Sequence, residues 1–366
     1  MIFCNKIWVH AEDNLLKSAK SGIVIELDTG DILYEYKMDE VRFPASTTKI
    51  MTIKLIMDAI HDGKLKHDQL ITTSEYASSM GGSQIYLAPN EQMTVDDLLK
   101  AVVIASANDA AVALAEAVAG TEELFVKKMN EEAINLGMKN THYLNATGLH
   151  EEGHVTTAHD LSIIARELLA KYGDEIIPLS SMYETYLRKD TDKPFWLVNT
   201  NKLIKGKNEI DGLKTGWTNQ AGYCLVATKK ANGMRIISVV MGAPTVDGRN
   251  QDTINLLNYT FANFEKQLIS PKGSIVQTEE NILMNPSIYN IVLSQDIARM
   301  IEKNAKDGII NYEIRIDDQK ITSGEGQKIG KLYVYIDDKL YKIIDLELKE
   351  KVKKSNFLEL FANKKV

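Results

Sequence analysis

The segment PASTTKIMTIKLIMDAIHDGK, residues 44–64, combines a long apolar helix with a serine and a lysine close to its start. Ile50, Ile53 and Met57 recur at helical spacing, and further apolar residues widen this stripe until the helix is apolar nearly all round. A helix of this kind has to be buried. The segment therefore predicts a core helix that ends near Gly63, and the rest of the domain has to pack around it.

The sequence before and after this helix contains patterns that predict the strands of a sheet. Residues 21–36, SGIVIELDTGDILYEY, predict two short strands joined by a turn. Helical patterns fill residues 94–173, and the first long one is broken near residues 106–109. Residues 223–243 then predict two strands joined at Asn232-Gly233. This order indicates an α/β (α+β) fold with one antiparallel sheet flanked by helices.

From about Pro271 onward the chain contains short alternating segments separated by polar turns, which predict a small all-β domain. We therefore expect a principal domain over residues 20–266 and a β-rich domain over residues 267–350.

The two ends of the chain carry weaker signals. Residues 1–19 begin MIFCNKIWVHA and resemble the remnant of a signal peptide, although a leader without meaning is an open alternative. Residues 351–366 hold a short apolar run with basic flanks. This run predicts a weak membrane anchor, with a frayed charged terminus as the alternative.

Composition excludes several classes of protein. The net charge of −7 argues against nucleic acid as the main partner. Cys4 and Cys224 lie far apart, so neither a disulfide framework nor a thiolate metal site is implied. No segment approaches the roughly 20 apolar residues that a membrane-spanning helix requires.

Three short motifs contain side chains that could take part in catalysis or substrate binding. Ser46 and Lys49 lie three residues apart, so a helix places them on one face, and a desolvated lysine can become the neutral base that a serine nucleophile needs. Ser106-Ala107-Asn108 puts polar residues inside an apolar helical stretch, where they need partners. The same tripeptide could instead be a capped turn between helices.

The third motif, Lys214-Thr215-Gly216, precedes the predicted hairpin. A lysine and a hydroxyl on a strand can hold a carboxylate, and a glycine lets a substrate approach the backbone. Together the three motifs, in this order and in these settings, form the signature set of penicillin-binding proteins and serine β-lactamases.

The chain resembles the low-molecular-mass penicillin-binding proteins that are D-alanyl-D-alanine carboxypeptidases. The resemblance covers residues 20–265 and includes, in family order, PASTTKIMT, GGSQIYL, ASANDAAVALAE, DGLKTGWTNQAGYCLVAT and MGAPTVDGRNQDT. It implies a penicillin-binding/β-lactamase-like transpeptidase fold. It also implies removal of the terminal D-alanine from peptidoglycan stem peptides, with β-lactams as covalent inhibitors.

The resemblance assigns roles to four residues of the first two motifs. Ser46 would attack the D-Ala–D-Ala carbonyl and become acylated, and Lys49 would take its proton. Ser106 would help to pass that proton to the leaving D-alanine, while Asn108 would orient the substrate and Lys49.

The third motif would bind the substrate. Lys214 and Thr215 would hold its terminal carboxylate beside Gly216, and the backbone N–H of Trp217 would join that of Ser46 in an oxyanion hole. Trp217 stands where relatives often have histidine, which should affect substrate preference and not activity. Arg249 could assist carboxylate binding or be a solvated charge. Relatives lack a dedicated glutamate for deacylation, so slow release of penicillin is expected.

Residues 150–154, HEEGH, match the zinc-protease pattern H-E-x-x-H, in which His150 and His154 would bind the metal and Glu151 would act as base. Gly148 and Gly153 with the β-branched residues that follow predict a loop, so the two imidazoles have no reason to converge on zinc. A zinc peptidase remains the first alternative function.

A non-catalytic wall-binding module is the second alternative, and the intact motif set argues against it. No metal or organic cofactor is implied. The substrate lies outside the cytoplasmic membrane, so the expected location is the cell envelope, at the outer face of that membrane, or secretion.

Overall fold

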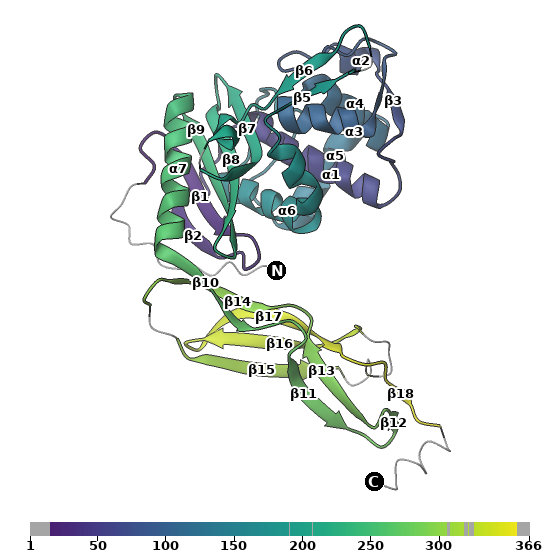
Figure 1. The fold of residues 1–366 in the computed structure, drawn as a ribbon, viewed down its shortest axis with the longest axis vertical. Coiled ribbons are helices and arrows are strands. Elements are labelled where there is room, and N and C mark those ends of the chain that lie inside the picture. The colour runs from purple at the N-terminus through teal and green to yellow at the C-terminus, as the bar shows by residue number, and fades with distance from the viewer. Residues whose placement is uncertain are drawn as a thin grey trace. The chain divides into compact units, whose positions relative to one another are not determined.

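The computed structural model describes residues 15–189, 191–206, 208–305, 308–317, 321 and 326–356. These residues form two compact units, and the chain passes from one to the other between Phe264 and Glu265 (Figure 1). Most of the predicted leader, residues 1–14, and the apolar part of the predicted anchor, residues 357–366, lie outside the described residues.

A five-stranded antiparallel sheet forms the centre of the larger unit, in the order β2-β1-β9-β8-β7. Its strands are β1 Ser21–Glu26, β2 Ile32–Tyr36, β7 Ile210–Thr218, β8 Gly222–Ala231 and β9 Met234–Ala243. The turn between β8 and β9 has φ of +52° at Asn232 and +74° at Gly233, the left-handed pair that a two-residue hairpin requires. Both predicted hairpins are therefore confirmed.

Helices cover both faces of this sheet (Figure 1). Helix α7, Val246–Asn263, packs on one face against β8 and β9, while α6, Ala158–Ser180, packs on the other against β1, β7 and β9. The remaining helices lie on the α6 side and are α1 Lys49–His61, α2 Glu75–Ser78, α3 Val95–Lys100, α4 Asn108–Ala119 and α5 Glu122–Leu136. The predicted fold class is confirmed.

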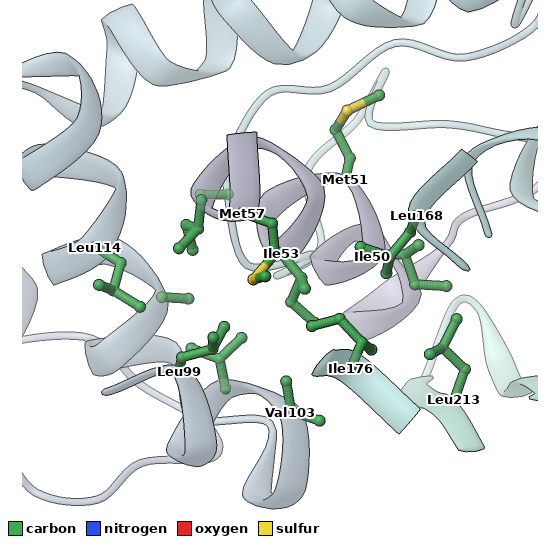
Figure 2. Packing of buried hydrophobic residues seen from close by; sticks show 14 of the residues in the cluster. Ile50, Met51, Ile53, Met57, Leu99, Val103, Leu114, Leu168, Ile176 and Leu213 are labelled. Carbon is green, nitrogen blue, oxygen red and sulfur yellow. The ribbon is translucent and has the colours of Figure 1, made fainter. Parts of the chain in front are cut away.

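Helix α1 is the buried centre of the helical layer, as its apolar pattern predicts. Ten of its thirteen residues are buried. Figure 2 shows its side chains packed among apolar residues from α3, α4, α6, β7 and the π-helical turn Ala101–Ala105. These surroundings hold α1 on all sides, so its first residues have a fixed position relative to α4 and β7.

Two short antiparallel pairs extend the helical layer. Strands β3, Leu70–Thr72, and β4, Gln92–Thr94, form one pair, and β5, Glu184–Leu187, and β6, Phe195–Val198, form the other. Thr94 accepts a hydrogen bond from the Asp97 N–H at 3.2 Å and so caps the start of α3. None of the helices in the described ranges is both long and apolar enough to cross a membrane.

The smaller unit is all-β, as predicted. Strand β10, Phe264–Ser270, pairs with β14, Ile297–Glu302. A five-stranded sheet has the order β11-β13-β17-β16-β15, with β11 Ile275–Glu280, β13 Ile288–Leu293, β15 Ile310–Ile316, β16 Lys328–Ile336 and β17 Lys339–Leu348. The short strands β12, Met284–Asn285, and β18, Lys353–Lys354, pair beside it. This unit has a separate hydrophobic core that includes Tyr289, Ile291, Val334 and Leu346.

Candidate active site

Ser46 lies in a 3₁₀ turn, Ala45–Thr48, that leads directly into α1. The turn is fixed by the Thr47 hydroxyl, which donates to the Pro44 carbonyl at 2.6 Å. The serine is thus one turn ahead of the regular helix that the sequence predicts, and Lys49 is the first residue of that helix. Although Ser46 lies in the 3₁₀ turn and not in the α-helix, the three-residue separation brings Lys49 Nζ within 3.1 Å of Ser46 Oγ.

The Lys49 amine is completely buried and is surrounded by oxygen atoms that carry no charge. Besides Ser46 Oγ it contacts Asn108 Oδ1 and the Thr147 carbonyl, each at 2.6 Å. Burial holds the pKa of Lys49 well below its usual value, with a further contribution from Lys214 that Asp109 opposes. Because no carboxylate within the described residues pairs with it, the amine can be neutral near physiological pH.

The second motif lies where the helical stretch breaks, as predicted. The π-helical turn Ala101–Ala105 ends at Ser106, whose φ of +63° is left-handed, and α4 begins at Asn108. The Asn108 side chain donates to the Gly81 carbonyl at 2.6 Å, so its oxygen must face Lys49. Ser106 Oγ is buried, and it has no hydrogen-bond partner in the part of the chain that the structure describes.

The third motif lies on β7, the edge strand of the sheet. A Cβ atom built on Gly216 would come within 3.0 Å of the Ser46 and Thr47 backbone nitrogens. Only glycine therefore lets β7 lie this close to the serine turn. On the same strand, Thr215 is mostly buried and its hydroxyl donates to Thr200 Oγ1 at 2.7 Å.

Lys214 and Arg249 form a pair of buried cations beside the site. Lys214 Nζ donates to the Thr215 carbonyl at 3.0 Å, and Arg249 donates to Asn250 Oδ1 at 2.8 Å. Burial, with a contribution from the Arg249 charge, lowers the pKa of Lys214 to about 7. Arg249 is 4% exposed, so the alternative of a solvated charge is wrong. Neither cation has an ion-pair partner among the described residues.

The H-E-x-x-H segment is a loop, as expected. His154 is buried, its Nδ1 accepts from the Leu144 N–H at 3.1 Å, and its Nε2 lies 2.9 Å from Thr48 Oγ1. The Nδ1 acceptor role leaves the proton on Nε2, so both ring nitrogens are occupied and no lone pair remains for a metal. His150 is exposed and packs edge-on against Phe43. The described residues contain no cluster of three His, Cys, Asp or Glu side chains that could hold a metal ion.

Sequence reasoning missed the groups that hold this site in place. The Thr147 carbonyl is a main-chain atom and leaves no trace in the sequence. The sequence pattern indicates His154 only as a metal ligand, whereas its ring connects the loop to the turn that carries Ser46. Asp109 follows Asn108 directly, and its buried carboxylate accepts from the Ile85 and Leu87 N–H groups. Its place in the helix break was a signal that could have identified it.

The chain matches two protein families and several individual relatives. A family model described as D-alanyl-D-alanine carboxypeptidase matches residues 9–245, and one described as the C-terminal domain of penicillin-binding protein 5 matches residues 264–354. D-alanyl-D-alanine carboxypeptidase DacF of Bacillus subtilis is 43% identical over 345 residues, which cover 94% of this chain and 88% of that protein.

Solved structures agree with the sequence matches. Penicillin-binding protein 5 from Haemophilus influenzae superimposes with a TM-score of 0.76 at 30% identity, covering 92% of this chain and 98% of the other. Penicillin-binding protein D2 from Listeria monocytogenes, solved in a cefotaxime-bound form, gives a TM-score of 0.61 at 33% identity, covering 68% of this chain and all of that one (100%).

The fold and the paired serine and lysine define a serine-type acyl-transfer hydrolase with the penicillin-binding fold. The chain belongs to the D-alanyl-D-alanine carboxypeptidase family, the penicillin-binding proteins of low molecular mass.

Gly148 offers a test of how tightly the loop packs on the serine turn. Its φ is +80°, and a Cβ atom built on it would lie 1.9 Å from the Ala45 carbonyl oxygen. Gly148→Ala should therefore destabilise the protein by more than the roughly 1–2 kcal/mol that left-handed backbone alone costs an alanine. It should also slow acylation by penicillin, because Thr147 moves with it. Urea denaturation and the rate of adduct formation measure the two effects.

Gly63→Ala is the matched control, because Gly63 has a φ of +73° and nothing within 4 Å of its added Cβ. Equal losses of stability in the two variants would contradict close packing at Gly148.

His154 predicts a pH dependence of stability. Burial, the main cause, lowers its pKa from 6.5 to about 4. Between these values the unfolded chain binds a proton that the native protein does not, so this contribution to stability is present above pH 6.5 and is lost as the pH falls towards 4. The total is about 3 kcal/mol. In His154→Gln, which cannot take up the proton, the free energy of unfolding should fall correspondingly less between pH 7 and pH 4.

The control is His67→Gln, which removes a half-exposed imidazole elsewhere on the surface. Parallel loss of stability in wild type and His154→Gln would show that the buried ring does not govern this pH range.

Proposed function

We propose that Ser46 is the nucleophile of the D-alanyl-D-alanine carboxypeptidase reaction and that neutral Lys49 is its general base. The contacts of Lys49 carry this proposal. A neutral amine has two N–H donors and one lone pair. If the donors bind Asn108 Oδ1 and the Thr147 carbonyl, both at 2.6 Å, the lone pair faces the Ser46 hydroxyl at 3.1 Å. The hydroxyl proton then has an acceptor already in place.

The reaction follows in two acyl transfers. Ser46 Oγ bonds to the carbonyl carbon of the penultimate D-alanine while its proton moves to Lys49. Collapse of the tetrahedral intermediate breaks the C–N bond, and the leaving D-alanine amine receives that proton through Ser106. Water then attacks the ester, which restores the Ser46 hydroxyl and releases the shortened stem peptide. The buried and unpaired hydroxyl of Ser106 supports its role as the relay, because a passing proton needs a group with free hydrogen-bonding capacity.

The developing oxyanion requires backbone donors. The close approach of Gly216 to the Ser46 N–H supports an oxyanion hole made by the N–H groups of Ser46 and Trp217, the residue after Gly216. The Trp217 side chain is 53% exposed and lies against Tyr223, and the proposed role uses only the backbone N–H of this residue.

The terminal carboxylate of the substrate would bind between Lys214, Thr215 and Arg249. Two buried cations without an acidic partner are costly unless an anion joins them, and the substrate supplies that anion. Asn108 would orient the substrate amide while it holds Lys49.

Penicillin would enter the same site and acylate Ser46. The cefotaxime-bound relative supports this expectation. Within the described residues the only hydrogen-bond partner of Ser46 Oγ is Lys49, and no carboxylate reaches it to activate a deacylating water. Release of the drug should therefore be slow.

The two alternative functions lose their support at this site. A zinc peptidase would need free lone pairs on His154, and both its nitrogens are engaged. A wall-binding module without turnover would not need a buried lysine amine aimed at a serine.

We further propose that the enzyme acts in the cell envelope, at the outer face of the cytoplasmic membrane or as a secreted protein, where its peptidoglycan substrate is located. Peripheral membrane contact through residues 351–366 remains a prediction from the sequence.

The first test of the function combines two measurements on one variant. Wild-type protein should gain the mass of one penicillin and should release D-alanine from diacetyl-Lys-D-Ala-D-Ala. Ser46→Ala should show neither, with turnover reduced by at least about 10³-fold, because the nucleophile is gone. Ser181→Ala, an exposed serine outside the site, should behave like wild type. An adduct that persists on Ser46→Ala would assign the nucleophile elsewhere.

The second test uses the pKa of Lys214. Since that pKa is about 7 in the free enzyme, the cation that binds carboxylate is lost as the pH rises, and KM should increase above pH 7. Arg249→Gln removes a neighbouring charge that lowers this pKa. The variant should bind substrate more weakly throughout, yet its increase in KM should begin at higher pH. Steady-state kinetics from pH 6 to pH 9 measure both effects. An unshifted or lower onset would contradict the proposed electrostatic coupling.

A further inference from the structure

An open pocket of about 680 Å³ lies outside the Ser46 site. Its walls come from the segment that follows the α2 helix and from the β5-β6 hairpin, and they include Ile85, Tyr86, Glu91, Arg188 and Phe195. None of these residues takes part in the proposed acyl transfer.

Tyr86 is held in an unusual conformation at the rim of this pocket. It is 72% exposed, and its φ is +56°, a left-handed value that a bulky side chain rarely adopts. The cause is Asp109, which is fully buried and accepts hydrogen bonds from the backbone on both sides of the tyrosine, from Ile85 at 3.1 Å and Leu87 at 3.0 Å. The backbone of Ile85 and Leu87 is thereby held towards the protein interior, and the Tyr86 ring between them faces outward. Strain held in place by a buried group is characteristic of functional positions.

The pocket surface is aromatic and electrically balanced. The Tyr86 and Phe195 rings lie 6.1 Å apart. Arg188 lies over the Phe195 ring, pairs with Glu91 at 2.7 Å and donates to the Ile85 carbonyl at 3.1 Å. Among the described residues that line the pocket, the other two charged ones, Asp192 and Lys193, have opposite signs. The charges of these described residues cancel one another, and the surface offers ring faces and polar edges to a neutral ligand.

The same backbone segments position the pocket and the catalytic groups. The Asn108 N–H donates to the Ser83 carbonyl at 2.7 Å, and Tyr86 is three residues further along, at most about 10 Å of extended chain away. On the other wall, β6 leads to Thr200, whose hydroxyl accepts from Thr215. The pocket is therefore built on segments that also contact the catalytic groups, and the remote part of a substrate held at Ser46 would extend along these segments in the arrangement proposed below.

The chemistry of the substrate identifies the part that fits. The stem peptide has a carboxylate-bearing residue and a diamino acid before the two D-alanines, and these are charged. Beyond them and one further neutral residue lies the neutral acetylated sugar to which the stem is attached, separated from the scissile carbonyl by four residues, or about 13–14 Å of fully extended chain, and the linking group. Pyranose rings present C–H faces that stack on aromatic rings and hydroxyl groups that bind polar side chains.

We propose that the pocket between Tyr86 and Phe195 binds the N-acetylated sugar at the base of the stem peptide. This inference rests on the proposed function, since it requires the stem to be held at Ser46. It makes the enzyme selective for glycan-linked stems over free peptides, through contacts made far from the bond that breaks.

The test compares two substrates that differ only in the sugar, an N-acetylmuramyl pentapeptide and the same pentapeptide with an acetyl group in its place. Wild type should show the higher kcat/KM on the muramyl substrate. Phe195→Ala and Tyr86→Asn should lower that value about three- to tenfold, the range for the loss of one aromatic contact, and should leave the sugar-free substrate unchanged. Asparagine tolerates the left-handed backbone, so Tyr86→Asn retains the fold.

Trp196→Ala is the matched control, because Trp196 is the next residue on β6, is 55% exposed and does not line the pocket. It should alter neither substrate. Equal losses on both substrates, or no loss on either, would overturn the sugar site while leaving the Ser46 proposal intact. Failure of wild type to hydrolyse either substrate would instead count against the proposed function.

Discussion

The buried amine of Lys49 is the constraint on which the rest of the site depends. Its neighbours are uncharged oxygen atoms, and no carboxylate in the described chain neutralises it. Burial in such surroundings lowers the pKa of the lysine and so favours the form that has given up its proton. The fold therefore uses desolvation in place of an imidazole to obtain a base, and it needs a core closed tightly enough to exclude water from that one group.

Closing the core requires three distant segments to meet at short range. The loop around Thr147 reaches the serine turn only because Gly148 has no side chain, and β7 reaches it only because Gly216 has none. The Asn108 side chain donates to the Gly81 carbonyl and its backbone N–H donates to the Ser83 carbonyl, so these contacts fix the position of the oxygen that meets Lys49. Each contact is local, but together they determine where the serine hydroxyl points.

Much of this arrangement could be predicted from the sequence. The periodicity of α1, the Asn232-Gly233 turn and the break at Ser106 are local signals, and the structure has each of them. The ordered motifs predicted which side chains would share a site. The sequence could not reveal the Thr147 carbonyl or the role of His154, because both depend on tertiary contacts. The burial of Arg249 was also undetermined, since the same residue on a helix can face water or core. The H-E-x-x-H pattern shows why spacing needs its context: it indicates a shared face only when the segment is helical, and the glycines around this one predicted the loop that the structure has.

The position of β7 at the margin of the sheet has one more consequence. An unpaired strand edge is a template for any extended chain, and proteins usually protect such edges against self-association. Here the serine turn lies beside Gly216 and occupies part of that edge. Any part of β7 that neither this turn nor another segment covers keeps the ability of an edge strand to pair with an extended peptide backbone.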